Sequence, residues 1–300
     1  MMHSLLQIRK EVPFKRPLLA ALLLACGALS ACYIPTMDMK KQTLMRLAVP
    51  SGMMAREIPA DPYIITSYER VARKNDVATV YIEGGQILWD DFIKEREVAT
   101  PMNPLALHMA TRDLSANVIW LARPCQYTTK LDGSACSRDE FTSGRYSLAN
   151  LKAMNRALDN VRRKYGFTGF NLVGVADGAG VAVHLAASRK DVLSLRTVAG
   201  VLDTYVFTQV YMPEEHEVFV DKSSNNPGMH AAYLAKLPQH HFIGEWDQTV
   251  GPEMAQSFRH AAGNSACIRV SEVKGTTDEK GWVNRWPDLL KNPVDCKAGQ

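Results

Sequence analysis

The chain has 300 residues, of which 46% are hydrophobic, 22% charged and 8% aromatic, and its formal net charge is +4. This composition excludes an intrinsically disordered chain, a collagen-like repeat and a small disulfide-packed protein, because it supplies enough apolar residues for a large core. The basic excess and the six cysteines point toward nucleic acid, an anionic membrane, a metal or redox chemistry. Which of these hypotheses remains depends on the residues that the mature protein contains.

The N-terminus has the pattern of a secretory signal peptide. A basic stretch at residues 9–16 precedes the apolar run 18–25, which is shorter than the roughly 20 residues that a membrane span needs. Leu-Ser-Ala-Cys follows at 29–32 and resembles the bacterial lipoprotein signal. The resemblance implies cleavage before Cys32 and diacylglycerol on its thiol. Ordinary signal-peptide cleavage with a free Cys32 is the alternative, and Cys26 is a poorer candidate for lipidation.

Removal of residues 1–31 as a signal peptide would change the net charge of the protein and predicts its location in the cell. This segment holds four basic and one acidic side chain, so the mature chain keeps 31 Lys+Arg and 30 Asp+Glu and gives no reason to expect nucleic acid. Acyl chains on Cys32 would hold the protein on a membrane, since each buried methylene contributes about 0.8 kcal/mol. Tyr33 rather than Asp follows the cysteine. The sorting rule of some Gram-negative bacteria then favours the outer membrane, with the protein facing the periplasm.

The mature chain is expected to consist of an arm and one α/β domain. Residues 32–60 contain several prolines and little periodicity, which is typical of a tether or an arm laid over the domain of residues 61–300. Within that domain, alternating strands and helices predict a mostly parallel sheet flanked by helices. The stretch of about 203–237 lacks a clear strand and is expected to be a cap or long-loop insertion. The predicted strands are 63–67, 77–82, 118–121, 170–175, 195–201, 241–244 and 267–273, and the predicted helices are 103–112, 148–165, 180–188, 252–262 and 284–291.

A sharp strand-to-helix turn is predicted at Gly-Val-Ala-Asp-Gly, residues 174–178. This is the pattern of a nucleophile elbow, whose tight turn requires small residues two positions before and two after the nucleophile. The two glycines meet that requirement around Ala176, which has no nucleophilic atom. Taking Asp177 as the nucleophile instead would put Val175 where a small residue is needed.

With five further motifs, the elbow makes the chain similar to the α/β-hydrolase superfamily, in particular to bacterial secreted serine-hydrolase-like lipoproteins. The similarity runs from about Val77 to Trp286 and implies the α/β-hydrolase fold. The supporting motifs are VYIEGG at 80–85, LARPCQY at 121–127, TVAGVLD at 197–203, GEWD at 244–247 and GTTDEKGW at 275–282.

The resemblance implies a position for each catalytic group. The acid follows a late strand at Asp247, and Asp203 is the weaker candidate. The histidine is expected shortly before the late Gly-Trp, where Asp278 stands. An aspartate with an unperturbed pKa of about 3.9 is a poor base near pH 7. The backbone N–H groups of the oxyanion hole map to Asp177 and to Gly85 or Gln86.

Two of the three triad positions, Ala176 and Asp278, therefore lack the required group. Loss of triad members typically costs about four to six orders of magnitude in turnover. The sequence thus predicts a catalytically inactive pseudo-hydrolase that binds or scaffolds an envelope protein or a small acyl-type ligand. It needs no cofactor.

Two other hypotheses remain open. An active envelope esterase or amidase could use non-standard groups, with a relocated base among His184, His216, His240 and His241. A nucleotide-binding oxidoreductase would use the glycines around the elbow to approach a pyrophosphate. The strict dinucleotide pattern fails there, because Val183 stands at its last glycine.

The cysteines that remain after the signal peptide and Cys32 are even in number. In an oxidising compartment this favours disulfides, and no Cys-x-x-Cys pair supports a zinc or thioredoxin-like site. The spacing favours two bridges, Cys125–Cys136 and Cys267–Cys296. No metal is expected.

Overall fold

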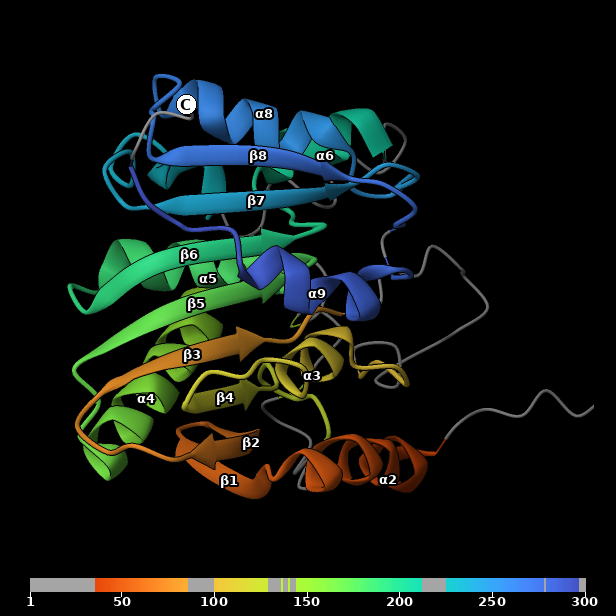
Figure 1. The fold of residues 1–300 in the computed structure, drawn as a ribbon, viewed down its shortest axis with the longest axis vertical. Helices are drawn as coiled ribbons and strands as arrows, with labels where there is room; N and C mark the ends of the chain where they lie inside the picture. Colours follow the sequence, from red (N-terminus) through yellow and green to blue (C-terminus); the bar gives the residue numbers. More distant parts are fainter. Residues whose placement is uncertain are drawn as a thin grey trace, which may run out of the picture. The chain divides into compact units, whose positions relative to one another are not determined.

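The centre of the folded chain is an eight-stranded sheet (Figure 1). In this computed structural model the described residues are 36–85, 100–128, 136, 140, 144–211, 225–277 and 279–296. The strands are β1 (Met54–Ala60), β2 (Tyr63–Val71), β3 (Val77–Ile82), β4 (Asn117–Leu121), β5 (Gly169–Val175), β6 (Val192–Val198), β7 (Gln239–Gly244) and β8 (Ile268–Val273). Their order across the sheet is β1-β2-β4-β3-β5-β6-β7-β8. The two pairs that involve β2 are antiparallel and the others are parallel, which confirms a mostly parallel α/β sheet.

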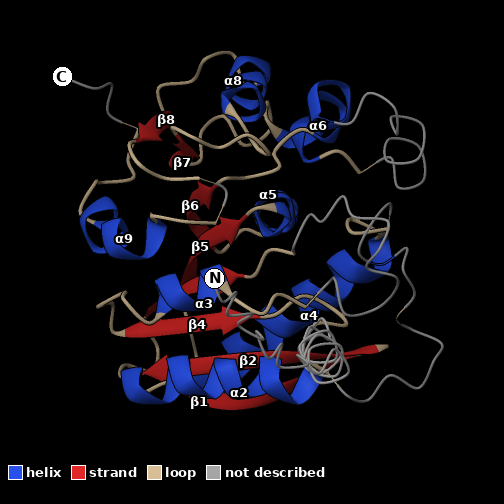
Figure 2. Cartoon of the chain, turned by 90° about the vertical axis from the view of Figure 1, so that its right-hand side faces the viewer, coloured by secondary structure: helices blue, strands red, loops and turns tan. Residues whose placement is uncertain are grey.

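Helices cover both faces of this sheet (Figure 2). The α-helices are α2 (Met37–Ala48), α3 (Leu105–Ala110), α4 (Leu148–Tyr165), α5 (Asp177–Ser188), α6 (Thr204–Tyr211), α8 (Pro252–Ala261) and α9 (Trp282–Leu290), and two 3-10 turns are η1 (Val49–Ser51) and η4 (Pro227–His230). One layer contains α4, α5, α6 and α8, and the other contains α3 and α9. None of the helices in the described part of the chain is long and apolar enough to cross a bilayer.

The two layers enclose two hydrophobic cores, and side-chain alternation along the strands assigns residues to them. In β3, Val80 and Ile82 belong to the core that contains α4 and α5. Tyr81, between them, belongs to the core that contains Trp282 and Trp286 of α9. Successive strand residues point to opposite faces. A parallel strand that is covered on both sides is therefore apolar at nearly every position.

The boundaries of α4 follow from its two ends. Ser147 is the N-cap, and its hydroxyl accepts a hydrogen bond from the N–H of Asn150 at 3.2 Å. Gly166 ends the helix with a φ of 73°, a left-handed conformation that glycine adopts without steric cost. The predicted helix 148–165 is confirmed with the same bounds.

The folded domain begins earlier than residue 61, which differs from the predicted arm. Residues 36–60 form α2, η1 and β1, and β1 pairs along its whole length with β2. Ile58 and Leu44 are fully buried, so this segment contributes to both cores. Because prolines are uncommon in strands, the sequence pattern did not predict this strand. Pro59 is tolerated because β1 is an edge strand and needs ladder bonds on one side only.

The stretch predicted as a cap or insertion is helical where it is described. It contains α6 and η4 and no strand among its described residues, 203–211 and 225–237. Here α6 contacts α8, and η4 contacts α5 and α8. The described part of the stretch therefore adds to the helical layer on that face.

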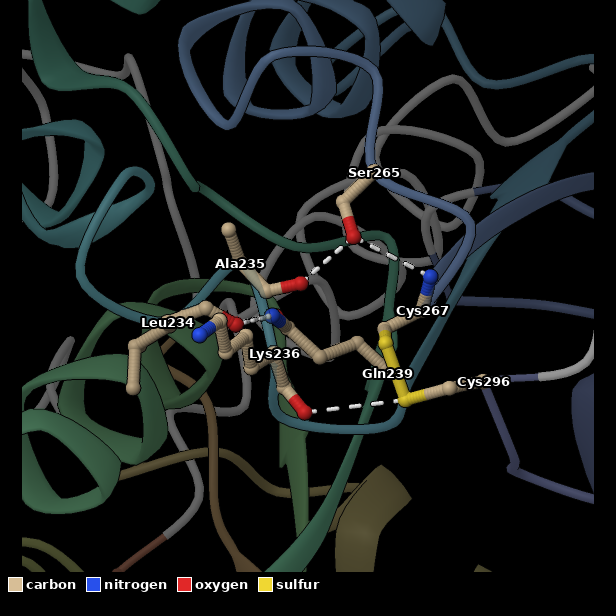
Figure 3. The surroundings of a disulfide bond; sticks show 7 residues. All are labelled: Leu234, Ala235, Lys236, Gln239, Ser265, Cys267 and Cys296. Carbon is tan, nitrogen blue, oxygen red and sulfur yellow. Dashed lines mark hydrogen bonds between the residues drawn. A yellow bond between two sulfur atoms is a disulfide. The ribbon is translucent and has the colours of Figure 1, made fainter.

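Both predicted disulfides are present. Cys125–Cys136 closes the loop after β4, and Cys267–Cys296 joins the start of β8 to the C-terminal tail. Figure 3 shows the second bridge beside the turn before β7, where the side-chain amide of Gln239 donates to the Leu234 carbonyl at 2.8 Å. The Ser265 hydroxyl accepts from the N–H of Cys267 at 3.1 Å and donates to the Ala235 carbonyl. This bridge thus fixes the tail to a hydrogen-bonded turn.

Candidate functional site

The turn between β5 and α5 has the strained geometry of a nucleophile elbow. Ala176 has φ 50° and ψ −124°, a region that non-glycine residues rarely occupy and that is concentrated at functional sites. A side chain at Gly178 would lie 2.6 Å from the carbonyl oxygens of Ile82 and Glu83. The elbow is therefore packed directly against the end of β3, and the nucleophile position holds a methyl group.

The carboxylate of Asp177, the residue after the elbow, is held by two groups from neighbouring strands. Its Oδ1 accepts a hydrogen bond from the N–H of Gly85 at 2.6 Å, and its Oδ2 lies 2.8 Å from Nη1 of Arg123. Both side chains are almost fully buried, with 2% of Asp177 and 4% of Arg123 exposed. The Gly85 N–H, expected to serve an oxyanion, is thus bonded to a carboxylate of the protein itself.

The loops around this ion pair are fixed by further hydrogen bonds. The amide of Gln126 donates to the Gly84 carbonyl at 2.9 Å and accepts from the N–H of Arg123 at 2.9 Å. The hydroxyl of Tyr146 donates to the Asp177 carbonyl at 3.0 Å. A Cβ at Gly85 would lie 2.5 Å from the Arg123 guanidinium, so a larger residue there would require this guanidinium to shift. These hydrogen bonds therefore hold the loops that carry the ion pair in place.

A second buried arginine lies near this carboxylate. Arg145 is 7% exposed. Burial lowers the pKa of its guanidinium, while the charge of Asp177 opposes this shift. Two buried guanidinium groups, those of Arg123 and Arg145, therefore lie near the Asp177 carboxylate.

Glu83 holds the glycine loop at residues 84–85, a role that the sequence alone did not predict. Its Oε2 accepts from Trp120 Nε1 at 2.8 Å and from the N–H of Leu107 at 3.2 Å. Its Oε1 accepts from the N–H groups of Gly84 at 3.1 Å and Ala106 at 3.2 Å. Burial raises the pKa of Glu83 to about 7, and these four donors act against the rise. A glutamate directly after a buried strand was the available signal.

The predicted acid, Asp247, lies in the loop after β7. Its Oδ1 accepts from the N–H groups of Thr249 at 2.9 Å and Val250 at 2.7 Å, which shapes the turn into α8. The N–H of Trp246 donates to the Thr276 carbonyl at 3.0 Å, so the loops after β7 and β8 are in contact. The acid position therefore lies beside the segment that leads to the predicted histidine position.

Asp203, the weaker acid candidate, has a structural role. Its Oδ1 accepts from the N–H groups of Tyr205 and Val206 at the start of α6. The Ser257 hydroxyl of α8 donates to its Oδ2 at 2.8 Å, and the Asn226 amide donates to Oδ1 at 2.8 Å. Both carboxylate oxygens therefore connect α6, η4 and α8.

The histidines considered as relocated bases are engaged in side-chain contacts where they are described. His240 lies 2.8 Å from the Ser271 hydroxyl, and His241 lies 2.8 Å from the Thr197 hydroxyl. Burial lowers the pKa of His240 to about 4, that of His241 to about 3 and that of His184 to about 4. Predicted residues that lie outside the described part of the chain are Cys32, Gln86, His216 and Asp278.

Metal and nucleotide sites find little support in the described residues. Within them, no group of three or more His, Cys, Asp or Glu side chains could hold a metal ion. The glycines at the elbow face protein atoms: a Cβ at Gly180 would meet the Tyr146 ring, and one at Gly178 would meet the end of β3. Packing inside the domain therefore explains these glycines without a pyrophosphate.

Comparison with known proteins identifies the fold. No family model and no curated protein matches the sequence. An α/β serine hydrolase homologue from Coxiella burnetii matches with a TM-score of 0.51 and 14% identity, over 79% of this chain and 93% of the other. Est1E from Butyrivibrio proteoclasticus matches with a TM-score of 0.54 and 11% identity, over 79% and 96%. TT1662 from Thermus thermophilus gives 0.51 and 14%, over 80% and 99%. The chain has the α/β-hydrolase fold.

Proposed function

We propose that this protein is a lipid-anchored pseudo-hydrolase of the bacterial cell envelope that acts by binding or scaffolding. One observation carries the proposal: the Asp177 carboxylate occupies the Gly85 N–H and forms a buried ion pair with Arg123, directly beside a nucleophile position that holds alanine. In a hydrolase of this fold, that N–H would stabilise the negative charge that develops on the substrate oxygen. A carboxylate in the same place repels such an oxyanion.

Three features oppose catalysis, and each acts on a different step. Ala176 offers no atom for attack. Asp278, at the expected histidine position, is a weak base near neutral pH. The Asp177 carboxylate engages a donor that would otherwise retain part of the rate enhancement after triad loss. A substitution that restores one of these three groups would therefore leave the other two obstacles to catalysis in place.

The anchoring part of the proposal rests on the N-terminal sequence. The basic stretch, the short apolar run and Leu-Ser-Ala-Cys at 29–32 support cleavage before Cys32 and its lipidation. The folded unit starts at Thr36, so four residues would connect the lipid to the domain. Two disulfides suit an oxidising compartment. We place the protein in the envelope, with the outer membrane as the expected site.

Hydrolysis assays test the catalytic part. The mature protein is incubated with short-chain p-nitrophenyl esters, with a short-chain p-nitroanilide and with a fluorophosphonate probe, beside Asp247→Ala and Asp177→Ala variants. We expect neither turnover above the buffer rate nor labelling. Turnover in the wild type that disappears in either variant, shown to be folded by circular dichroism, would establish the esterase or amidase alternative.

Mass spectrometry tests the anchor. The N-terminal peptide of protein from its native membrane should begin at Cys32 and carry diacylglycerol, and a Cys32→Ser variant should leave the membrane fraction. An unmodified Cys32 in the mature chain would end the lipoprotein proposal. Proteins that co-purify with the wild type, and are absent from the Cys32→Ser sample, are the candidates for a scaffolded partner.

A further inference from the structure

A pocket lies in the helical layer, away from the elbow. It has a volume of about 530 Å³ and is lined by residues of α4 and α5 together with Asn225 and His230. Small-molecule sites typically have about 300–1,000 Å³. His184 on its wall is eight residues beyond Ala176, which corresponds to about 12 Å along a helix. The pocket is therefore distinct from the elbow.

One end of the pocket is polar and electrically neutral. His184 Nε2 lies 3.1 Å from the Asn225 carbonyl, which can only accept, so Nε2 carries the proton. His184 Nδ1 therefore accepts from His230 Nε2, at 2.9 Å. Burial lowers the pKa of both rings, that of His184 to about 4. The Asn225 amide donates to the Tyr146 carbonyl at 2.8 Å. These groups bond mainly to one another.

Three further side chains that can donate to a ligand come from α4, and two of the three are cationic. The Lys152 ammonium forms no hydrogen bond or ion pair with any described residue. Arg156 uses Nη1 on the Asp61 carbonyl and keeps its other N–H groups. Asn155 uses its Oδ1 on Arg189 and keeps its NH₂. The described lining contains no Asp or Glu. The pocket thus offers donors and positive charge.

The rest of the wall is apolar. Leu151, Leu185 and Ala187 line the pocket, and so does Leu148, which is 61% exposed. An apolar ligand body would remove this surface from water, and each buried methylene on the ligand would add to binding.

We propose that this pocket binds a small organic anion with an apolar body, of the class of medium-chain monocarboxylates. The carboxylate lies against Lys152 and Arg156, and the chain lies along the leucines of α4 and α5. The pocket does not include the elbow residues, so this proposal can be tested separately from the proposed loss of hydrolase activity.

Calorimetric titration with three probes of equal chain length tests the head group. Octanoate, octanol and octylammonium are titrated into the full mature protein at pH 7. Octanoate should bind about tenfold more tightly than octanol, because two exposed cations contribute modestly to affinity, and octylammonium should not bind. Equal binding of all three, or no binding of octanoate, would overturn the proposal.

Matched variants locate the site. Lys152→Glu should weaken octanoate binding about tenfold or more. Arg163→Glu makes the same charge change on the exposed face of α4, outside the pocket, and should leave it within about twofold. Ala187→Phe fills the pocket without a change of charge and should abolish binding. Circular dichroism establishes that each variant is folded. Octanoate affinity that Lys152→Glu and Arg163→Glu reduce equally, or that Ala187→Phe leaves unchanged, would contradict the assignment.

Discussion

The Asp177 carboxylate connects the ends of three neighbouring strands. It follows β5, while Gly85 follows β3 and Arg123 follows β4, and both donate to it. Parallel strands bring their carboxyl ends to one edge of the sheet, which is where α/β proteins place their sites. An anion-binding arrangement typical of a working site is here completed by a side chain of the protein. The same residues are expected to stabilise the fold and, under the proposed function, to oppose catalysis.

Removal of this carboxylate should destabilise the protein strongly. Asp177→Ala leaves the Arg123 guanidinium buried without its counter-ion, and breaking such a pair typically costs about 3–5 kcal/mol. Urea denaturation measures the free energy of unfolding. Asp288→Ala, which removes an exposed ion pair with Lys291, serves as the control and should have no measurable effect. Added formate should restore part of the loss in Asp177→Ala only. An unchanged unfolding midpoint would show that the pair is not a stabilising element.

Restoration of probe labelling should require three changes. Ala176→Ser supplies an attacking hydroxyl, Asp278→His supplies a base, and Asp177→Gly frees the Gly85 N–H. We expect fluorophosphonate labelling of the triple variant and at least about a tenfold lower labelling rate for Ala176→Ser/Asp278→His, because one oxyanion-hole donor contributes about two to three orders of magnitude. Equal labelling of the two folded variants would show that the Asp177 carboxylate does not obstruct the site.

At the scale of elements, local sequence signals set most helix and strand limits. Ser147 and Gly166 mark both ends of α4, and continuous apolar runs mark the central parallel strands. Elements at the edge of the domain carry weaker signals. β1 contains a proline and an exposed face, and its pairing with β2 becomes visible only in the assembled sheet.

The tail bridge should stabilise the domain by a measurable amount. Cys267 and Cys296 are 29 residues apart, and closing a loop of that size in the unfolded chain corresponds to about 3.5 kcal/mol. The double variant Cys267→Ala/Cys296→Ala, which leaves no free thiol at this site, should lose this amount in urea denaturation. Dithiothreitol should then destabilise the variant less than it destabilises the wild type. A variant as stable as the wild type would mean that the bridge does not stabilise the fold.

At the scale of the whole molecule, buried histidines make stability depend on pH. The pKa of His241 is about 3 in the folded protein and about 6.5 in the unfolded chain. Its stabilising contribution is therefore complete above pH 6.5 and declines as the pH falls toward 3. Between pH 6.5 and 5 the loss from this residue amounts to about 2 kcal/mol, or about 4–8 °C in Tm.

Thermal melts of the wild type and His241→Gln between pH 7.5 and 5 check this expectation. The variant should show a shallower decline of Tm toward acid pH, since it lacks the group that the unfolded chain protonates. Glu83 acts in the opposite direction, because its pKa of about 7 in the fold favours the protonated native state. It is present in both proteins, so its contribution cancels. An equal decline of Tm toward acid pH in the two proteins would contradict the assignment of this pH dependence to His241.

The sequence by itself determined the α/β class, seven of the eight strands, the elbow glycines and both disulfide pairs. These features depend on local periodicity, on small residues at a tight turn and on the number and spacing of cysteines. Asp247 and Asp203 were both candidates for the acid, since each follows a strand. The bonds of Asp203 to α6, η4 and α8 became visible only in the structure.

The tertiary structure alone decided which distant residues the elbow contacts. Asp177, Arg123 and Gly85 are distant in sequence, and their meeting depends on the order of β4, β3 and β5 in the sheet. A sequence motif reports which atoms a turn carries. It does not report which distant charge those atoms meet, because ion pairs and pockets are set by the packing of separate elements. The Asp177–Arg123 pair and the cationic pocket beside α4 are therefore properties of the folded chain.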